Sequence, residues 1–352
     1  MSFLYLLDLP TAFIVSYLVT PLVINFFHSH HWIEDPKVKQ QISGNATATK
    51  PVPRGGGLPI FISVFITSLL FLPLDKHLIG ILLASLFALI IGLFDDLKDI
   101  SPLFRLATNF VSAMLVVAAG IGIAYVSNPF GGVFDLSHPQ IFFSFLGSTH
   151  SIWLLADLLA IFWIVWCMNF VGWASGVDGQ LPGFISISAI FIGILGLKFQ
   201  NDVTQWPVII LAFTVAGAYL GFLPFNFYPQ KIMPGYSGKS LAGLFLAILS
   251  ILSGAKLATV IFLLGLPMLD AIFVIIYRLW HHRSPIKSDS NHLHHQLLKL
   301  GWGRRRISLF YWFLSLVLGF LSLILNSQQK FYVFIGLAII FFGFTLKFFR
   351  RI

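Results

Sequence analysis

The sequence has few charged residues and almost no cysteine. Only 10% of its 352 residues are Asp, Glu, Lys or Arg, whereas 57% are hydrophobic and 16% aromatic. A soluble domain carries about 25% charged residues, so a water-soluble globule of this length would lack the side chains that cover its surface. The single cysteine, Cys167, excludes an intramolecular disulfide framework. These shortages predict an integral membrane protein without room for a separate soluble domain of ordinary size.

Apolar segments follow one another along the whole chain. The N-terminal MSFLYLLDLP has no basic residue and no small-residue cleavage site, so we expect the first segment to be retained as a span. A spanning helix needs about 20 apolar residues, and the composition allows about ten or eleven spans. We therefore predict an all-α polytopic membrane protein with a single domain over residues 1–352. Its candidate helices lie at 5–27, 58–74, 77–94, 106–126, 152–170, 184–198, 207–225, 240–255, 257–277, 307–326 and 331–347.

Lysine and arginine are divided unevenly between the two sides that these spans define. With the N-terminus outside, 18 of the 22 Lys and Arg residues fall in the loops of one side, together with eight of the eleven histidines. Cytoplasmic loops are rich in Lys and Arg, so this side and the C-terminus are predicted to be cytoplasmic. The net charge of +9 would suggest nucleic acid in a soluble protein. Here membrane orientation explains it, and we expect no nucleic-acid partner.

Side chains suited to chemistry gather in five predicted cytoplasmic segments, 28–57, 95–105, 171–183, 226–239 and 278–306. In GLFDDLKDISPLFRL, Asp95 and Asp96 end a span. Adjacent carboxylates at a helix end can hold Mg²⁺, which prefers oxygen ligands and is often bound by one or two carboxylates plus phosphates. The alternative is an ordinary solvated helix end.

Two further segments combine glycine with polar residues. In MNFVGWASGVDGQLPG, Asn169 and Asp178 lie among glycines, where backbone can approach a ligand closely. The segment GYSGKS lacks the first glycine of a phosphate loop, because position 233 is Met233, and no strand precedes it. We therefore reject a phosphate loop there. Lys231 and Lys239 remain candidate partners for an anion, or are simply lysines of the positive side.

The last segment, RLWHHRSPIKSDSNHLHHQLLKLGWGRRR, combines histidines with basic residues. His292, His294 and His295 beside Arg283 are candidates to bind a metal, a phosphate or a nucleotide. A basic patch attracted to anionic lipid is the alternative, but it does not explain so many histidines. A charged side chain inside a membrane span costs free energy. We therefore expect Asp157 and Asp270, which lie within predicted spans, to be functional or paired.

Taken in order, five blocks of the sequence resemble the polyprenyl-phosphate N-acetylhexosamine-1-phosphate transferases of glycosyltransferase family 4. The blocks are PVPRGGGLPI, GLFDDLKDISPLFRL, NFVGWASGVDG, GFLPFNFYPQKIMPG and SPIKSDSNHLHH, and they cover residues 50–296. The spacing of the last block is similar to the N-acetylglucosamine-1-phosphate branch rather than the muramoyl-pentapeptide branch.

The resemblance implies a membrane enzyme that initiates cell-wall or surface polysaccharide synthesis in the bacterial inner membrane, with its active face cytoplasmic. A UDP-N-acetylhexosamine, by expectation UDP-N-acetylglucosamine, would transfer its sugar 1-phosphate to undecaprenyl or another polyprenyl phosphate and release UMP. The expected cofactor is Mg²⁺, and a homodimer is a further expectation. By motif position, the roles are Asp95, Asp96 and Asp178 for catalysis, with Asp95 and Asp96 as metal ligands, and Asn169, Asn226, Lys231, Lys239, Arg283, His292, His294 and His295 for substrate binding.

Three positions depart from the family pattern. Gly172 replaces an Asn, Ser175 replaces an Asp, and Tyr236 replaces an Asp implicated in Mg²⁺ binding. In one account the remaining carboxylates and substrate oxygens hold the metal, and Lys239 supplies charge that a cation supplies elsewhere. In the other, the chain is a degenerate member that acts as a partner or regulator of an active transferase. A secondary transporter is a third alternative, disfavoured because the polar residues lie in loops and no repeated halves are visible.

Overall fold

The computed structural model describes residues 7–36, 50–145, 148–253, 257–284 and 291–349. Its helices are α1 (Asp8–Ser29), α3 (Gly57–Phe71), α4 (Lys76–Lys98), α5 (Pro102–Ala118), α6 (Leu154–Trp173), α7 (Gln180–Leu197), α8 (Trp206–Asn226), α9 (Gly235–Leu252), α10 (Leu257–Leu263), α11 (Gly265–Trp280), α12 (Leu293–Lys299), α13 (Arg304–Ile324) and α14 (Ser327–Phe349). The short elements are β1 (Ile33–Glu34), β2 (Val52–Pro53), β3 (Tyr125–Ser127), β4 (Val133–Asp135), β5 (Gln140–Phe145), β6 (Ser148–Trp153) and the 3₁₀ turn η2 (Val203–Gln205).

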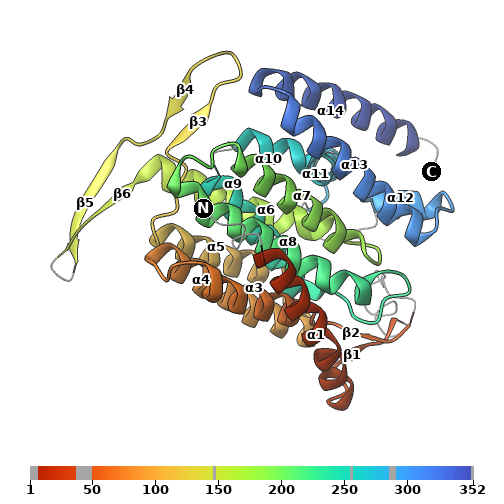
Figure 1. The fold of residues 1–352 in the computed structure, drawn as a ribbon. Coiled ribbons are helices and arrows are strands. Elements are labelled where there is room, and N and C mark those ends of the chain that lie inside the picture. The colour runs from red at the N-terminus through yellow and green to blue at the C-terminus, as the bar shows by residue number, and fades with distance from the viewer. Residues whose placement is uncertain (1–6, 37–49, 146–147, 254–256, 285–290, 350–352) are drawn as a thin grey trace.

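The helices form one bundle (Figure 1). Each predicted apolar segment overlaps at least one helix, but 106–126 extends beyond the end of α5 at Ala118, and 257–277 overlaps two helices, α10 and α11. Among the described residues, eight helices are long and apolar enough to cross a membrane: α1, α4, α6, α7, α8, α9, α13 and α14. The apolar helices α3 and α5 are shorter, with 15 and 17 residues. The predicted all-α, multi-pass membrane fold is confirmed, while the orientation of the termini remains a prediction.

The structure differs from the prediction at 257–277, where we expected one continuous helix. The chain bends by 79° between α10 and α11. Pro267 lies in the first turn of α11, and it has no N–H to donate to the carbonyl of Leu263, the last residue of α10. A proline ring also clashes with the carbonyl four residues earlier, so a continuous helix through this point is disfavoured. The bend directs α11 toward the end of the bundle that carries α12.

The centre of the bundle is built from α7, α8 and α9. The segments 184–198 and 240–255 are the shortest of the predicted helices, yet α7 and α9 are among the most buried. Each helix begins earlier than predicted, inside a polar, glycine-containing motif that lowers its hydropathy. Small residues allow helix backbones to approach closely, and Gly243 of α9 packs directly on the backbone of Met168 in α6.

Two sets of strands lie outside the helices. Strands β1 and β2 pair with Ile33 opposite Pro53, and Met233 continues the contact through hydrogen bonds with Pro53 O (2.9 Å) and Gly56 N (3.0 Å). This arrangement ties the segment before α3 to the segment before α9. The hairpins β3–β4 and β5–β6 lie in the aromatic-rich connection between α5 and α6 and protrude from the bundle (Figure 1).

The close contact at Gly243 gives a test of the helical packing. A Cβ at this position would lie 2.6 Å from Cys167 O and closer still to Met168, and both are backbone contacts of a buried helix. Overpacking of this kind costs about 1–3 kcal/mol, so Gly243→Ala is expected to lower the thermal unfolding midpoint of the purified protein. Gly336→Ala is the matched control, because nothing lies within 4 Å of its Cβ position. Equal midpoints for the two variants would contradict the packing of α9 on α6.

Candidate active site

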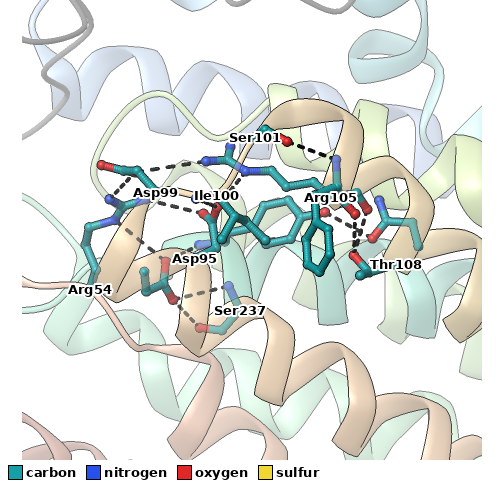
Figure 2. Close-up of polar contacts among 12 residues, drawn as sticks. Arg54, Asp95, Asp99, Ile100, Ser101, Arg105, Thr108 and Ser237 are labelled. Carbon is teal, nitrogen blue, oxygen red and sulfur yellow. Dashed lines mark hydrogen bonds and ion pairs between the residues drawn. The ribbon is translucent and has the colours of Figure 1, made fainter.

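Asp95 lies where the chain leaves α4. The next turn is completed by Asp99, which adopts a left-handed conformation with φ 48°. Oδ1 of Asp95 accepts hydrogen bonds from Ile100 N (3.1 Å) and Arg105 Nε (2.6 Å), as Figure 2 shows. Oδ2 is buried and has no hydrogen-bond partner among the described residues, with Arg54 Nη2 at 3.7 Å. One oxygen therefore fixes Asp95 in place and the other remains available.

The adjacent carboxylate, Asp96, points to a different helix. Its Oδ1 accepts a hydrogen bond from Tyr236 N (2.6 Å), and its Oδ2 accepts bonds from Ser237 N (3.3 Å) and Ser237 Oγ (2.6 Å). These amides open α9, and the first amides of a helix lack partners within it and attract negative charge. Gly235 leaves room for the contact, because its Cβ would lie 2.5 Å from Asp96 Cγ. Asp96 thus occupies the place at GYSGKS that a phosphate would take in a phosphate loop.

Arg54 connects the carboxylates around the end of α4. Its guanidinium lies 3.0 Å from Glu34, 2.9 Å from Asp99, 3.6 Å from Asp96 and 3.7 Å from Asp95 (Figure 2). Burial lowers the pKa of Arg54, but Asp96, Glu34 and Asp99 raise it by more, so the net shift is upward and the charge is permanent. The β1–β2 pair brings Arg54 and Glu34 to this position from a segment remote in sequence.

Tyr236 holds a second arginine in place. The Tyr236 hydroxyl donates a hydrogen bond to Asn109 Oδ1 (3.0 Å), and the guanidinium carbon of Arg105 lies 5.1 Å from the centre of the tyrosine ring. A cation over an aromatic face is attracted by the ring quadrupole. Arg105 is therefore fixed by Asp95 at its Nε and by Tyr236 beneath its guanidinium.

Asp178 lies in the turn between α6 and α7. Its Oδ1 pairs with Arg304 Nη1 (3.0 Å), its Oδ2 accepts a hydrogen bond from Gln230 N (3.3 Å), and its carbonyl accepts one from Ser308 Oγ (2.6 Å). These partners come from the start of α13 and from the segment before α9. Asp178 is thus buried at a junction of three chain segments and is ion-paired.

The two candidate asparagines have different surroundings. Asn226 is buried, accepts a hydrogen bond from Gly179 N (2.9 Å) and donates to Ile232 O (2.9 Å) and Gln230 Oε1 (3.1 Å). It therefore fixes the loops on both sides of the site. Asn169 donates to Val165 O (2.7 Å) in its own helix and lines the cavity described below.

The histidine segment is anchored by the in-span carboxylate Asp270. Its Oδ2 lies 2.9 Å from His292 Nδ1, and its Oδ1 accepts a hydrogen bond from Leu293 N (2.8 Å) at the start of α12. The rings of His292 and His294 are parallel, with centres 5.9 Å apart. The expectation that Asp270 is paired is confirmed, and its pairing holds His292 in the wall of the cavity described below.

His294 is buried against the glycine-rich turn. A Cβ at Gly176 would overlap its ring, so only glycine permits this contact. Burial lowers the pKa of His294 well below its usual value, and His295, His292 and Lys239 lower it further. The imidazole is therefore neutral near pH 7. Its Nδ1 is buried without a hydrogen-bond partner among the described residues, so a ligand can supply one.

A cavity of about 690 Å³ joins these groups. Each of the five motif segments contributes to it. One part of its wall is polar and carries Glu34, Arg54, Asp95, Asp99, Arg105, Asn169, Asp178, Gln230, Tyr236, Lys239, Arg278, His292, His294 and His295. Another part is apolar and carries Leu106, Phe110, Phe162, Val165, Trp166 and Ile275.

The structure separates the predicted site residues into two groups. The cavity is lined by Asp95, Asp178, Asn169, Lys239, His292, His294 and His295, but Asp96 and Asn226 lie behind its wall. Lys231 and Arg283 are exposed and do not line it. Among residues not assigned a role from sequence, Arg54, Arg105 and Arg278 line the cavity. The motif PVPRGGGLPI contains Arg54, but its importance follows from four carboxylates that only the fold brings together.

The carboxylates around the cavity do not fit a metal site built from this chain. Among the described residues, no three His, Cys, Asp or Glu side chains are grouped to hold a metal ion. Asp95 and Asp178 are each paired with an arginine, and both oxygens of Asp96 accept hydrogen bonds from the start of α9. Tyr236 directs its hydroxyl to Asn109, and no carboxylate is present at Gly172 or Ser175. The carboxylates that could supply oxygen ligands to a metal are therefore already paired with arginines or with helix amides.

Neutral His294 gives a pH-dependent prediction. Below pH of about 6.5 the unfolded chain protonates this histidine and the folded protein does not, so the unfolded state binds more protons. Stability is expected to fall as pH decreases below that value, by at most about 1.4 kcal/mol per pH unit. Thermal unfolding of His294→Gln should show a weaker loss between pH 7.5 and 5.5 than the wild type. The exposed His28→Gln is the control, and identical pH profiles for wild type and His294→Gln would contradict a buried, neutral His294.

Comparison with known proteins identifies the family. Residues 78–254 match the sequence profile of Glycosyl transferase family 4. The chain is 27% identical over 337 residues to a probable undecaprenyl-phosphate N-acetylglucosaminyl 1-phosphate transferase of Bacillus subtilis, covering 94% of this chain and 87% of the relative. It is 31% identical over 290 residues to a decaprenyl-phosphate N-acetylglucosaminephosphotransferase of Mycobacterium tuberculosis, covering 74% and 68%. It is 28% identical over 321 residues to a phospho-N-acetylmuramoyl-pentapeptide-transferase of Bacillus cytotoxicus, covering 88% and 94%.

The profile match spans half of the chain, and most of the residues that line the cavity lie within it, including those at the end of α4, in the turn after α6 and at the start of α9. The family predicted from the five sequence blocks is confirmed: this multi-pass membrane protein belongs to glycosyltransferase family 4.

Proposed function

We propose that this protein transfers N-acetylglucosamine 1-phosphate from UDP-N-acetylglucosamine to a polyprenyl phosphate, releasing UMP. The observation that carries the proposal is the cavity, in which all five motif segments meet and an apolar wall continues into a charged one. The named relatives act on undecaprenyl or decaprenyl phosphate, which combine a long apolar chain with a phosphate. The two walls correspond to these two parts of one acceptor.

The apolar wall is suited to the prenyl chain. It is formed by Leu106 and Phe110 of α5 and by Phe162, Val165 and Trp166 of α6. Phe110 and Phe162 are 41% and 62% exposed, so this side of the cavity is continuous with the surface that faces lipid. A prenyl chain can therefore lie along α5 and α6 while its phosphate reaches Arg105, which is on α5 as well.

The charged wall is suited to the transfer itself. An oxygen of the acceptor phosphate forms a bond to the phosphorus that carries the sugar, and the bond from that phosphorus to the bridging oxygen of UMP breaks. UMP leaves with the bridging oxygen. Phosphoryl transfer asks mainly for positioning and charge stabilisation, which Arg54, Arg105 and Lys239 supply. The Oδ2 of Asp95, which accepts no hydrogen bond from the described residues, can accept the proton of the acceptor phosphate, so that the attacking group is fully ionised.

The histidines are suited to the nucleotide end of the donor. Among the described residues the Nδ1 of His294 has no hydrogen-bond partner, and His292, held by Asp270 through its Nδ1, lines the cavity. Mg²⁺ is generally expected for phosphotransferases of this family. Because the carboxylates of this chain are paired with arginines and helix amides, no step proposed here uses a metal.

The setting of the reaction is part of the proposal. The bias of Lys and Arg supports a cytoplasmic active face in a bacterial inner membrane, where a nucleotide sugar is available. The product would initiate a cell-wall or surface polysaccharide. A homodimer remains a prediction, which native mass spectrometry of the detergent-solubilised protein tests.

A transfer assay tests the proposed function. Purified protein in detergent is incubated with radiolabelled UDP-N-acetylglucosamine and undecaprenyl phosphate, with and without added divalent metal. We expect a labelled lipid product that appears together with UMP. No lipid product with any UDP-N-acetylhexosamine would overturn the enzyme and favour the degenerate partner suggested by Gly172, Ser175 and Tyr236.

Substitutions of the two adjacent carboxylates are expected to have different effects on transfer and on stability. Asp95→Asn should reduce transfer at least about 100-fold, the scale of a lost catalytic acid–base group, and should lower the thermal unfolding midpoint less than Asp96→Asn does, because the amide oxygen can still accept the hydrogen bonds from Ile100 N and Arg105 Nε. Asp96→Asn should also lower the free energy of unfolding, by roughly 3 kcal/mol, because Arg54 and the start of α9 lose a buried anion. Asp202→Asn, on an exposed turn, is the control. A stable Asp96→Asn variant with an unchanged midpoint would contradict the structural role of Asp96.

A further inference from the structure

Lys239 is a cation without a counter-ion in the charged wall. It lies on α9 one turn after Tyr236 and lines the cavity. Among the described residues it makes no ion pair or hydrogen bond, whereas Arg54, Arg105 and Arg304 are each paired with a carboxylate. The charged groups that act on its ammonium include Arg54, Arg105, Asp96 and Glu34. A largely buried ammonium is costly unless an anion joins it, so Lys239 in the cavity wall is suited to bind a ligand of negative charge.

The residues around Lys239 depart from the family pattern together. A Cβ at Gly172 would lie 3.7 Å from Lys239 Cβ, so the glycine leaves space beside the lysine stem. Tyr236 stands where the family carries an acidic residue, and it supports the guanidinium of Arg105. Gly172 thus leaves room beside one cation, Lys239, and Tyr236 fixes a second cation, Arg105. Both changes move the site from binding a metal toward presenting its own positive charge.

The carboxylates near Lys239 are also poorly suited to hold a metal, because each already has a partner. Asp95 accepts a hydrogen bond from Arg105 Nε at 2.6 Å, and Asp178 pairs with Arg304 at 3.0 Å. Asp96 is used by the first amides of α9. A dication placed among them would lie next to Arg54, Arg105 and Lys239, and like charges at such distances repel strongly where water is scarce.

We propose that Lys239, with Arg54 and Arg105, binds the diphosphate of the nucleotide sugar in place of a divalent metal ion, so that this member of the family works without one. The proposal rests on the function proposed above, because it names the groups that neutralise that substrate. Lys239 lies between the histidines and the end of α4 and can contact the donor phosphates directly. It is assigned a binding and catalytic role, and Tyr236 is a positioning residue for Arg105.

Binding without turnover tests the proposal first. Protein stripped with EDTA is titrated calorimetrically with UDP-N-acetylglucosamine in EDTA and then in Mg²⁺. The dissociation constants are expected to agree within about twofold. Lys239→Met should weaken binding in EDTA about tenfold or more, the scale of a hydrogen bond to a charged group, and Lys239→Arg should retain most of it. Lys299→Met, an exposed lysine outside the cavity, is the matched control.

The transfer assay supplies the second readout. The EDTA-treated wild type should retain its rate within about twofold, and Lys239→Met should lose about 100-fold or more, the scale of a lost charge-stabilising donor. Binding or transfer by the wild type that appears only with Mg²⁺ would overturn the inference while leaving the proposed function standing. Lys239-dependent binding in EDTA with no lipid product would overturn the proposed function instead. No binding under either condition, or normal binding by Lys239→Met, would also overturn the inference.

Discussion

The contact between Asp96 and the first amides of α9 organises the site. It joins the end of α4 to the start of α9, one of the three central helices, and it places the Asp95 carboxylate, Arg54 and Tyr236 around one point. A helix start without a capping side chain of its own needs an external anion, and Pro234 provides none. Removing Asp96 would therefore release the N-terminus of α9, and with it the backbone that carries Tyr236 and Lys239 into the cavity.

The other carboxylates join separate chain segments, Asp99 and Asp178 through ion pairs with arginine and Asp270 through hydrogen bonds. Arg54 ties the segment before α3 to the end of α4, Arg304 ties the start of α13 to the turn after α6, and Asp270 ties α11 to α12. Each pair joins segments that are remote in sequence, and together they close the polar wall of the cavity. A phosphate ligand entering this wall meets cations that are already oriented, so little reorganisation is required on binding.

The contact with Asp96 also explains why GYSGKS, which is similar to part of a phosphate loop, does not form one here. In GYSGKS, the helix amides that would bind a phosphate instead donate hydrogen bonds to the Asp96 side chain, while Lys239, two residues beyond Ser237, lines the cavity. The anion-binding capacity of the helix start is therefore used for architecture. The lysine keeps its capacity for a ligand, which is the basis for a site that depends on side-chain cations.

Sequence alone determined the membrane class, the apolar segments and the motifs that carry polar chemistry, because hydropathy and residue type are local properties. It also marked Asp95, Asp178, Lys239 and the histidines, all of which line one cavity. Only the tertiary structure decided which partner each charge has. Asp96 caps the start of α9 and does not line the cavity. Arg54 contacts several carboxylates, and the segment 257–277 forms two helices separated at Leu264. Electrostatic roles depend on neighbours from distant segments, and no local pattern encodes those distances.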